Sequence, residues 1–498
     1  MFGQATASLG LLLGNPEVMG FVLLGTAIGL VFGALPGLSG VVAMSLVLPL
    51  TFGMEPEQAM FMYAGIMGGN PVGGSISAIM INAPGTAVNA ATCFDGYPMA
   101  QKGEAGRALG ISATASGAGA VFGVLILILA FPLIRIAVTA FGAPETFMFI
   151  LFGLGAIVVA AQGNILKGLF AGGLGIILSL VGQSVITGEI RYNFGTVYLW
   201  DGIQLIPFVI GVFALAEMIN LTVKGKTAVA AAKVTGQELT KGVGQGIKDV
   251  FHHLRGLLRG SAIGTLVGII PGVGGAAANF VSYTVAMQSS THPETFGTGE
   301  IEGVIASESA NNAKDGGSLI PTLGFGIPGS AEMAVLLGAF ILHGLIPGPL
   351  LIGDHPEIVW ALIWGLVMSN VLAAGFVLIA ARYLCKLADV NLAYIIPIVV
   401  SLSIMGAYAI RGSFFDVLVA VAFGFFAFFL RKGGFPIITM VIGFILGSLA
   451  EKAFMQSLMI SGGDYSIFVT RPISLVLLLL LIGVFVIPLV RRGDGGEA

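Results

Sequence analysis

The segment GTAIGLVFGALPGLSG at residues 25–40 decides the fold of this chain, because residues 260–275 repeat it as GSAIGTLVGIIPGVGG. An offset of 235 residues aligns the two segments without a gap, with eight identities in sixteen positions. In both, a glycine at every fourth position leads into a Pro-Gly break inside apolar sequence. Non-helical backbone at membrane depth is tolerated only where it is buried in protein or lines a cavity, and broken helices in both halves of a chain are typical of transporters.

The composition places the chain in a membrane. Of its 498 residues, 56% are hydrophobic and 9% are charged, and its mean hydropathy is +0.99, which no water-soluble domain of this size presents. Apolar runs long enough to cross the hydrocarbon recur, for example at 108–136 and 474–490, without the alternation of a membrane β-barrel. We therefore expect an all-α polytopic membrane protein with about twelve transmembrane elements, some of them broken or re-entrant.

Several kinds of site and signal are missing from the sequence. Cys93 and Cys385 are the only cysteines, which excludes a disulfide framework and a cysteine-based metal site. We expect neither a metal nor an organic cofactor. Residues 1–16 carry no basic n-region, so no cleaved signal peptide is expected either.

The distribution of basic residues predicts the orientation in the membrane. The segment from Lys224 to Arg259 holds seven of them and is the expected cytoplasmic connector: Lys224, Lys226, Lys233, Lys241, Lys248, Arg255 and Arg259. The number of membrane crossings on either side of this segment predicts a cytoplasmic location for Lys102, Arg107 and the terminal Arg491 and Arg492. It predicts a periplasmic location for the N-terminus. The first copy of the repeat then starts on the periplasmic face and the second on the cytoplasmic face, so the two copies are predicted to be inverted.

This topology gives the domain organisation. An N-terminal membrane half at 1–223 contains the first repeat at about 18–110, and a basic connector follows at 224–254. A C-terminal membrane half at 255–490 contains the second repeat at about 255–352, and residues 491–498 form a cytoplasmic tail. Inverted repeats place a binding site at their interface near the middle of the bilayer.

A second matched element gives each repeat two interruptions. GGSISAIMINAPGT at 73–86 corresponds to GGSLIPTLGFGIPGS at 316–330, with one residue inserted in the later copy. Polar residues precede both copies, namely Asn70 and Pro71 in the first half and Asn311, Asn312, Lys314 and Asp315 in the second. A polar cluster therefore recurs where lipid-facing sequence is expected.

The breaks predict a receptor for an anion. A helix that restarts inside the membrane exposes unpaired N–H groups and about half a positive charge. Ser and Thr are expected to begin the restarted helices, where they cap amides or offer a hydroxyl to a carboxylate: Ser39, Ser75, Thr86, Ser318 and Ser330. Glycines beside them let a ligand approach the backbone: Gly37, Gly40, Gly73, Gly74, Gly85, Gly272, Gly274, Gly275, Gly316, Gly317 and Gly329. Prolines interrupt each helix at Pro36, Pro84, Pro271 and Pro328, and the carbonyls freed at Pro36 and Pro271 are candidates for a coupling cation.

Polar residues near the breaks have two possible roles each. Lys314 either meets a substrate carboxylate or neutralises Asp315, because a charge at the bilayer centre needs a cavity or a partner. Asp315 is a candidate ligand for the coupling cation, and Glu308 is a further one that could equally pair locally. Asn70, Asn311 and Asn312 either contact substrate or satisfy freed backbone. The glycines at four-residue spacing, 25, 29, 33 and 260, 264, 268, are expected to pack helices.

The motifs resemble the large membrane subunit of the tripartite tricarboxylate transporters, the TctA type. The resemblance rests on GALPGLSG at 33–40, GGNPVGGSISAIMINAPGT at 68–86, CFDGYPMAQKGEAGRALG at 93–110 and SANNAKDGGSLIPTLGFGIPGS at 309–330. It implies a bacterial inner-membrane secondary transporter that works with a small membrane subunit and a periplasmic substrate-binding protein. It also implies uptake of citrate or related carboxylates, with Na+ as the coupling ion and H+ as the alternative.

Two other function classes compete with ion-coupled uptake. A passive anion channel would show a ring-forming filter, whereas the breaks here occur as a pair. An intramembrane enzyme would need a nucleophile with its base or a metal cluster, and the sequence has no HExxH motif. No GxxxxGK[ST] loop is present, which favours secondary over ATP-driven transport.

Overall fold

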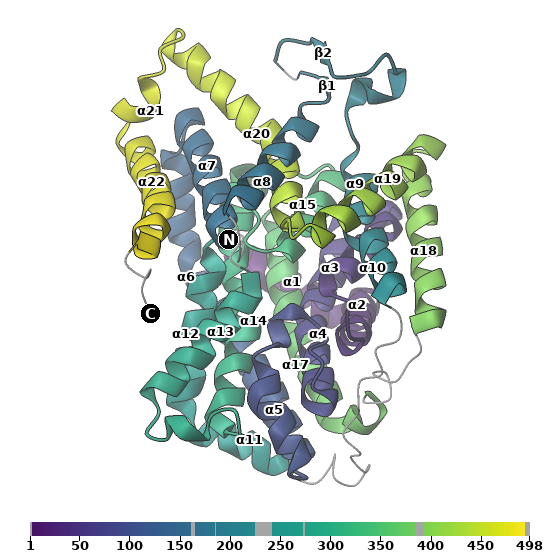
Figure 1. Ribbon diagram of the computed structural model, residues 1–498, viewed down its shortest axis with the longest axis vertical. Helices are drawn as coiled ribbons and strands as arrows, with labels where there is room; N and C mark the ends of the chain where they lie inside the picture. Colours follow the sequence, from purple (N-terminus) through teal and green to yellow (C-terminus); the bar gives the residue numbers. More distant parts are fainter. Residues whose placement is uncertain are drawn as a thin grey trace.

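The computed structural model describes residues 2–160, 165–184, 186–224, 242–271, 274–384 and 392–493, and helices make up most of them (Figure 1). The first half begins with α1 (Phe2–Gly14), α2 (Pro16–Ala34), α3 (Gly40–Val47), a 3-10 turn at Leu48–Gly53 and α4 (Pro56–Ile81). A short turn, η2 (Ala87–Asn89), then leads into α5 (Thr92–Gln101), α6 (Ala105–Ala140), α7 (Ala143–Ala160) and α8 (Ile165–Ser179).

The one sheet among the described residues is a hairpin of two-residue strands, β1 (Gly182–Gln183) and β2 (Ile190–Arg191). After a 3-10 turn at Val197–Asp201, one continuous helical stretch contains α9 (Leu205–Val209), a π-helical turn at Ile210–Leu215 and α10 (Ala216–Lys224). Apart from this hairpin, the expected helical fold is confirmed.

The second half is also helical. It contains α11 (Val243–His252), α12 (Leu254–Ile269), α13 (Gly274–Ser289), a 3-10 turn at Pro293–Thr295, α14 (Ile301–Phe325), α15 (Ala331–Leu342), α16 (Pro349–Asp354) and α17 (Pro356–Leu384). The chain continues with α18 (Leu392–Ala409), α19 (Phe414–Lys432), α20 (Ile437–Ser461), α21 (Ile467–Thr470) and α22 (Pro472–Gly493). Cys385 and residues 225–241 of the predicted connector lie outside the described residues.

Six described helices are long and apolar enough to cross a membrane: Pro16–Ala34, Ala105–Ile134, Leu205–Lys224, Pro356–Ile379, Phe414–Lys432 and Ile437–Ser461. Six further apolar helices are shorter: Gly40–Gly53, Ala143–Gly155, Ile165–Ser179, Ala331–Leu342, Ala393–Ala409 and Pro472–Gly483. The protein is therefore a multi-pass membrane protein that contains both long spans and shorter apolar helices.

The regularly spaced glycines pack helix against helix, as predicted. A Cβ on Gly25, Gly29 or Gly33 of α2 would lie 2.2, 2.5 or 2.1 Å from a backbone carbonyl oxygen of α4. In the second half, a Cβ on Gly264 or Gly268 of α12 would lie 2.4 or 2.3 Å from a carbonyl oxygen of α14. Backbones approach this closely only where a side chain is missing, so α2 is held against α4 and α12 against α14 by the same device.

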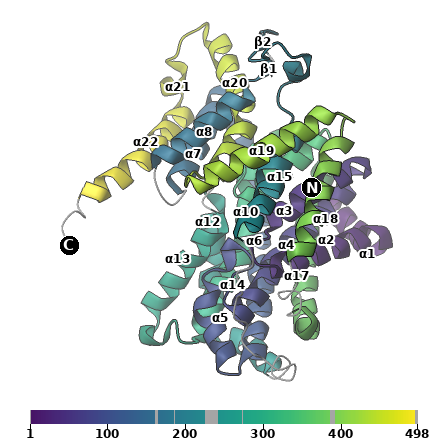
Figure 2. The ribbon, with the colours of Figure 1, turned by 45° about the vertical axis from the view of Figure 1, so that its right-hand side comes forward.

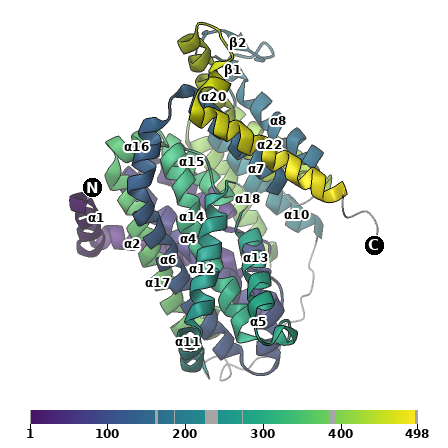
Figure 3. The same ribbon diagram turned by 90° about the vertical axis from the view of Figure 1, so that its left-hand side faces the viewer.

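A group of helices at one side of the molecule is joined by ion pairs. Helices α7, α8, α20, α21 and α22 lie together beside the glycine-packed helices, and α22 runs outward toward the C-terminus (Figures 2 and 3). Arg471 Nε lies 2.7 Å from Glu145 Oε1, which joins the α21–α22 connection to α7. Arg191 on β2 holds both carboxylate oxygens of Glu451 on α20, at 2.8 and 3.0 Å.

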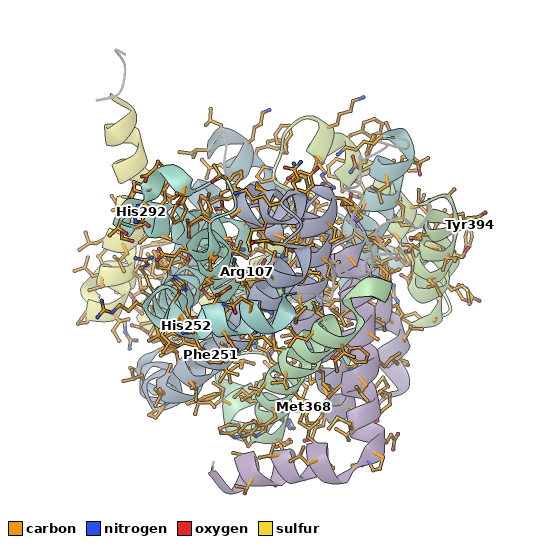
Figure 4. The ribbon with its side chains drawn as sticks, turned by 90° about the horizontal axis from the view of Figure 1, so that it is seen from below. Arg107, Phe251, His252, His292, Met368 and Tyr394 are labelled. Carbon is orange, nitrogen blue, oxygen red and sulfur yellow. The ribbon has the colours of Figure 1, made fainter. Side chains whose placement is uncertain are left out.

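The opposite end of the molecule from the hairpin carries α5, α11 and the loop after α13 (Figure 1). Figure 4 views this end and shows Arg107, His252 and His292 on it. Arg107 Nε donates a 2.6 Å hydrogen bond to Asp249 Oδ2, which fixes α11 against the start of α6. Residues 242–254 of the predicted basic connector, which include α11, therefore lie on this end.

Candidate functional site

The four chain breaks converge on one cavity of about 640 Å³. Two of them belong to the first half, after α2 and after α4, and two to the second, after α12 and after α14. Residues of all four line the cavity: Gly37, Leu38, Ser39, Val41 and Val42; Pro84, Gly85, Thr86, Ala87 and Val88; Gly274, Gly275 and Ala276; Ser330, Ala331 and Glu332. Segments more than two hundred residues apart thus share one wall.

Restarted helices supply part of this wall. Ser39 is the N-cap of α3, and Ser330 is the N-cap of α15, where its Oγ accepts a hydrogen bond from the Met333 N–H at 3.4 Å. Thr86 precedes the η2 turn. The prediction that these three residues begin helical segments is confirmed.

The same prediction is wrong for Ser75 and Ser318. Both lie inside continuous helices, α4 and α14, which pass through Pro71 and Pro321 and end at Ile81 and Phe325. The neighbouring glycines permit close packing instead of a break, because a Cβ on Gly73 would lie 2.4 Å from Leu30 O and one on Gly317 would lie 2.1 Å from Thr265 O. Ser318 Oγ donates to Gly268 O at 3.2 Å, which ties α14 to α12.

The cavity therefore contains only part of the predicted set. It is lined by Gly37, Ser39, Gly85, Thr86, Gly274, Gly275 and Ser330. It is not lined by Pro36, Gly40, Asn70, Gly73, Gly74, Ser75, Pro271, Asn311, Asn312, Lys314, Asp315, Gly316, Gly317, Ser318 or Gly329. Gly272 lies outside the described residues.

Asn70 and Lys314 occupy matching places directly behind this wall. A Cβ on Gly33 would meet Asn70 O, and a Cβ on Gly268 would meet Lys314 O, so both residues lie opposite the last packing glycine. Each side chain also reaches the start of a restarted helix. A Cβ on Gly40 would lie 2.9 Å from Asn70 Oδ1, and one on Gly275 would lie 2.6 Å from Lys314 Cε. The two halves thus use an amide and an ammonium at one equivalent position.

Lys314 is held by two carboxylates. Its Nζ lies 2.6 Å from Asp315 Oδ1 and 2.9 Å from Glu332 Oε2, and the side chains of Lys314 and Asp315 are both 1% exposed. Glu332 is 14% exposed and lines the cavity. The predicted pair of Lys314 and Asp315 is therefore present, and Glu332 connects it to the cavity.

The sequence analysis did not select Glu332 as a site residue, although its position in the sequence marks it as a residue of a first helical turn. It stands two residues after the N-cap Ser330, in the first helical turn, where acidic residues are favoured by the helix dipole. The cavity wall also contains Glu217, Lys224 and Arg431, and Arg431 forms an ion pair with Glu217. Lys224 entered the sequence analysis only as a marker of orientation.

Glu308 lies in a cage of hydroxyl groups. It accepts hydrogen bonds from Ser75 Oγ at 2.8 Å to each carboxylate oxygen, from Thr92 Oγ1 at 2.5 Å and from Ser116 Oγ at 2.7 Å. It does not join Asp315. The two carboxylates considered for a cation are therefore in different surroundings.

The asparagine side chains near the breaks differ in their hydrogen-bond partners. Asn312 Nδ2 donates to Asn370 Oδ1 at 2.5 Å, and Asn70 Nδ2 donates to Gly29 O at 3.4 Å. Both polar atoms of the buried Asn311 side chain have no hydrogen-bond partner among the described residues. The described residues contain no group of three His, Cys, Asp or Glu side chains that could hold a metal ion.

Comparison with known proteins identifies the family of the chain. Residues 19–442 match the model of the tripartite tricarboxylate transporter TctA family, and the chain belongs to that family. It is a membrane subunit of a tripartite tricarboxylate transporter and not an enzyme. A tripartite system implies further subunits.

Two proteins of Agrobacterium vitis are similar to the chain. One, an uncharacterised 52.8 kDa protein in the TAR-I ttuC' 3' region, is 37% identical over 467 residues, which is 93% of this chain and 91% of the relative. The other, an uncharacterised protein in the TAR-II ttuC' 3' region, is 37% identical over 215 residues, which is 43% of this chain and 89% of the relative. No solved structure matches the chain.

Proposed function

We propose that this chain is the permease subunit of an ion-gradient-driven secondary transporter in the bacterial inner membrane, which imports citrate or a related dicarboxylate or tricarboxylate by alternating access. A periplasmic binding protein delivers the substrate, and a small membrane subunit completes the complex. One observation carries the proposal: breaks from both halves of the chain meet at one cavity of about 640 Å³. Inverted repeats with such breaks are how secondary transporters build a midplane site.

The cavity wall has the chemistry that a carboxylate needs. The N-terminal ends of α3 and α15 point unpaired N–H groups and partial positive charge toward it, with Ser39 and Ser330 at their caps. Gly37, Gly274 and Gly275 keep side chains away from the backbone there. A multivalent carboxylate can therefore meet amides from both halves at once.

Lys314 supplies the charge for binding. Its ammonium is neutralised by Asp315 and Glu332. An incoming carboxylate would replace Glu332 as the second partner, because Glu332 is the one of the two that reaches the cavity. Substrate binding is thereby coupled to the position of α15.

We infer that the cavity opens toward the cytoplasm. Lys224 at the end of α10 lies in its wall and belongs to the basic connector that is predicted to be cytoplasmic, and Arg431 in the last turn of α19 adds a second basic residue to the same wall. The conformation is thus inward-facing, with the N-terminus periplasmic and the C-terminus cytoplasmic. The inward-facing conformation releases substrate to the cytoplasm. Capture of substrate from the binding protein requires an outward-facing conformation.

Counterflow tests the proposal. The chain and its two partners are reconstituted into proteoliposomes preloaded with unlabelled citrate, and entry of labelled citrate is measured without an ion gradient. A transporter accelerates labelled uptake when substrate is present on the far side. A passive anion channel would conduct equally with empty vesicles, and exchange with no carboxylate at all would refute the proposal.

A further inference from the structure

Glu308 is an acidic side chain with no exposed surface and no cationic partner. It is 0% exposed on α14, and no Lys, Arg or His nitrogen of the described residues lies within 4.0 Å of its carboxylate. Its partners are hydroxyls from three other helices: Ser75 on α4, Thr92 on α5 and Ser116 on α6. A buried charge without a counter-ion is costly, so the group calls for a proton or a cation.

Other buried acids of this protein are held differently. Glu145, 1% exposed, faces Arg471, and Asp416, 0% exposed, faces Arg411 at 2.9 Å. Asp95 accepts three backbone N–H groups, from Gly297, Gly299 and Glu300. The surroundings of each of these acids stabilise a carboxylate anion. The hydroxyl groups around Glu308 can instead either donate to a carboxylate anion or accept a hydrogen bond from the neutral acid.

The neighbouring ionisable groups do not neutralise Glu308. On its own helix, Lys314 is bound to Asp315 and Glu332. On α6, Arg107 is bound to Asp249 and Glu104. On α12, Arg259 donates to Ser289 and Arg255 is exposed. On α5, Asp95 bonds to backbone, and the Cys93 thiol is the remaining titratable group that faces Glu308.

The oxygen spacing distinguishes a proton from a metal cation. Hydroxyl oxygens stand 2.5–2.8 Å from the carboxylate oxygens, which is hydrogen-bond distance. Oxygens around a hard cation lie about 2.0–2.6 Å from the ion and hence roughly 3 Å or more from one another. The carboxylate oxygens of Glu308 are therefore engaged by hydrogen bonds at distances that favour a proton over a metal cation.

A hydrogen-bonded chain connects this cage to the cavity. Thr86, which lines the cavity, donates to Asn89 Oδ1 at 2.6 Å, and Asn89 Nδ2 donates to Ser75 Oγ at 2.8 Å. Ser75 then donates to Glu308 at 2.8 Å. Ser75 also has a second acceptor, Pro71 O at 3.1 Å, to which its hydrogen can turn when Glu308 carries a proton.

We propose that Glu308 is the proton-binding site that couples this transporter to the proton gradient, with Ser75, Asn89 and Thr86 linking its protonation to the substrate cavity. This inference rests on the proposed function, and it selects H+ over Na+ at this site. A proton from the periplasmic side binds to the Glu308 carboxylate and gives the neutral acid, and the same proton leaves to the cytoplasm, with no other bond broken. Since Glu308 joins α14 to α4, α5 and α6, its charge state changes how the two halves hold together.

A spectroscopic test reads the proton directly. Infrared difference spectra of the purified chain are recorded during acidification, and the carbonyl band of a buried protonated carboxyl is followed. We expect a band that Glu308→Gln removes and that the matched control Glu145→Gln retains, because Glu145 is paired with Arg471. Absence of such a band at every pH, or its persistence in Glu308→Gln, overturns the proposal.

A second variant keeps the Glu308 carboxyl, so the assignment can still be tested if Glu308→Gln does not fold. Ser116→Ala removes one donor to the charged form of Glu308, so the band should appear at higher pH than in the wild type. A band whose midpoint does not move in Ser116→Ala belongs to another residue and refutes the assignment.

Transport separates this inference from the proposed function. Accumulation of citrate driven by an acidic exterior should be lost in Glu308→Gln, whereas wild-type vesicles should show both this accumulation and counterflow. Proton-driven accumulation by Glu308→Gln at the wild-type level overturns the proton site and leaves the permease function intact. Wild-type vesicles that show no counterflow would instead refute the proposed function.

Discussion

Lys314 on α14 and Glu332 on α15 form an ion pair of 2.9 Å across the chain break that separates the two helices. Asn70 holds the position of Lys314 in the first half, beside Gly40 as Lys314 is beside Gly275. The first half therefore presents a neutral amide where the second presents a charge. This asymmetry makes the second half the one that responds to an anion.

Removing the charge of Glu332 is expected to raise the affinity for citrate. In Glu332→Gln the ammonium of Lys314 keeps Asp315 and becomes free to bind a carboxylate, so the apparent KM in the counterflow assay should fall by about tenfold, the lower range for a hydrogen bond to a charged group. Glu294→Gln, at an exposed position outside the cavity wall, serves as the control. An unchanged KM would separate Glu332 from substrate binding.

Loss of Lys314 is expected to damage stability as well as transport. Lys314→Met leaves Asp315 buried without its partner, and breaking a buried pair in this way costs about 3–5 kcal/mol. The double variant with Lys314→Met and Asp315→Asn removes both charges, so thermal stability in detergent should recover while counterflow stays lost. Recovery of counterflow in the double variant would show that Lys314 only neutralises Asp315.

Gly33 and Gly20 lie on the same helix and make a matched pair. Gly33→Ala places a Cβ 2.1 Å from Asn70 O and should push α2 away from α4, at a cost of about 1–3 kcal/mol or more and with a lower yield of folded protein. Gly20→Ala meets nothing within 4 Å and should leave the melting temperature unchanged or raise it. Equal melting temperatures for the two variants would contradict the packing of α2 on α4.

The pair of Arg107 and Asp249 predicts sensitivity to acid. Burial raises the pKa of Asp249, but the hydrogen bonds from Arg107 and Gln245 outweigh it, so this pKa lies below its usual value. A lowered folded-state pKa adds stability above the unfolded pKa of about 3.9, and the contribution is lost as the pH falls through the folded pKa. Thermal melts in detergent at falling pH should therefore show Asp249→Asn below the wild type by roughly 1 kcal/mol or less near pH 7 and equal to it in strong acid. A constant gap would exclude this linkage.

Asp95 is expected to order the loop before α14. Its Oδ1 accepts the N–H groups of Gly297, Gly299 and Glu300 at 2.8 Å each, and its Oδ2 accepts the Tyr283 hydroxyl at 2.8 Å. Asp95→Ala removes the acceptor of these part-buried backbone donors, at about 0.5–1.5 kcal/mol for each lost hydrogen bond. Hydrogen exchange of residues 297–300 should accelerate in Asp95→Ala and much less in Tyr283→Phe, which loses a single bond. Unchanged exchange in Asp95→Ala would show that the loop is held by other contacts.

Much of the fold could be predicted from the sequence, because it depends on local chemistry. Pro-Gly breaks at Pro36 and Pro271 interrupt apolar helices wherever they occur, since proline removes a backbone donor. Ser39 and Ser330 follow breaks and hold the N-cap positions of α3 and α15, and the Ser330 side chain caps its helix by accepting the Met333 N–H. The spacing of Gly25, Gly29 and Gly33 predicted close packing because residues four apart lie on one face of a helix.

The sequence was ambiguous where one residue type serves two purposes. Glycine beside Ser75 and Ser318 is compatible with a break or with close helix contact, and only the approach of Leu30 and Thr265 selects the contact. This is why the two serines were wrongly expected at restarted helices.

The sequence by itself determined the membrane medium, the two pairs of breaks and the polar residues next to them, since these depend on hydrophobicity and on backbone chemistry along the chain. Tertiary structure alone decided which of them share a cavity. Glu332 meets Lys314 across a break, and Glu308 meets Ser75 from 233 residues away, because packing in three dimensions and not spacing in the chain brings these side chains together. Charge partners and proton sites are properties of such long-range contacts.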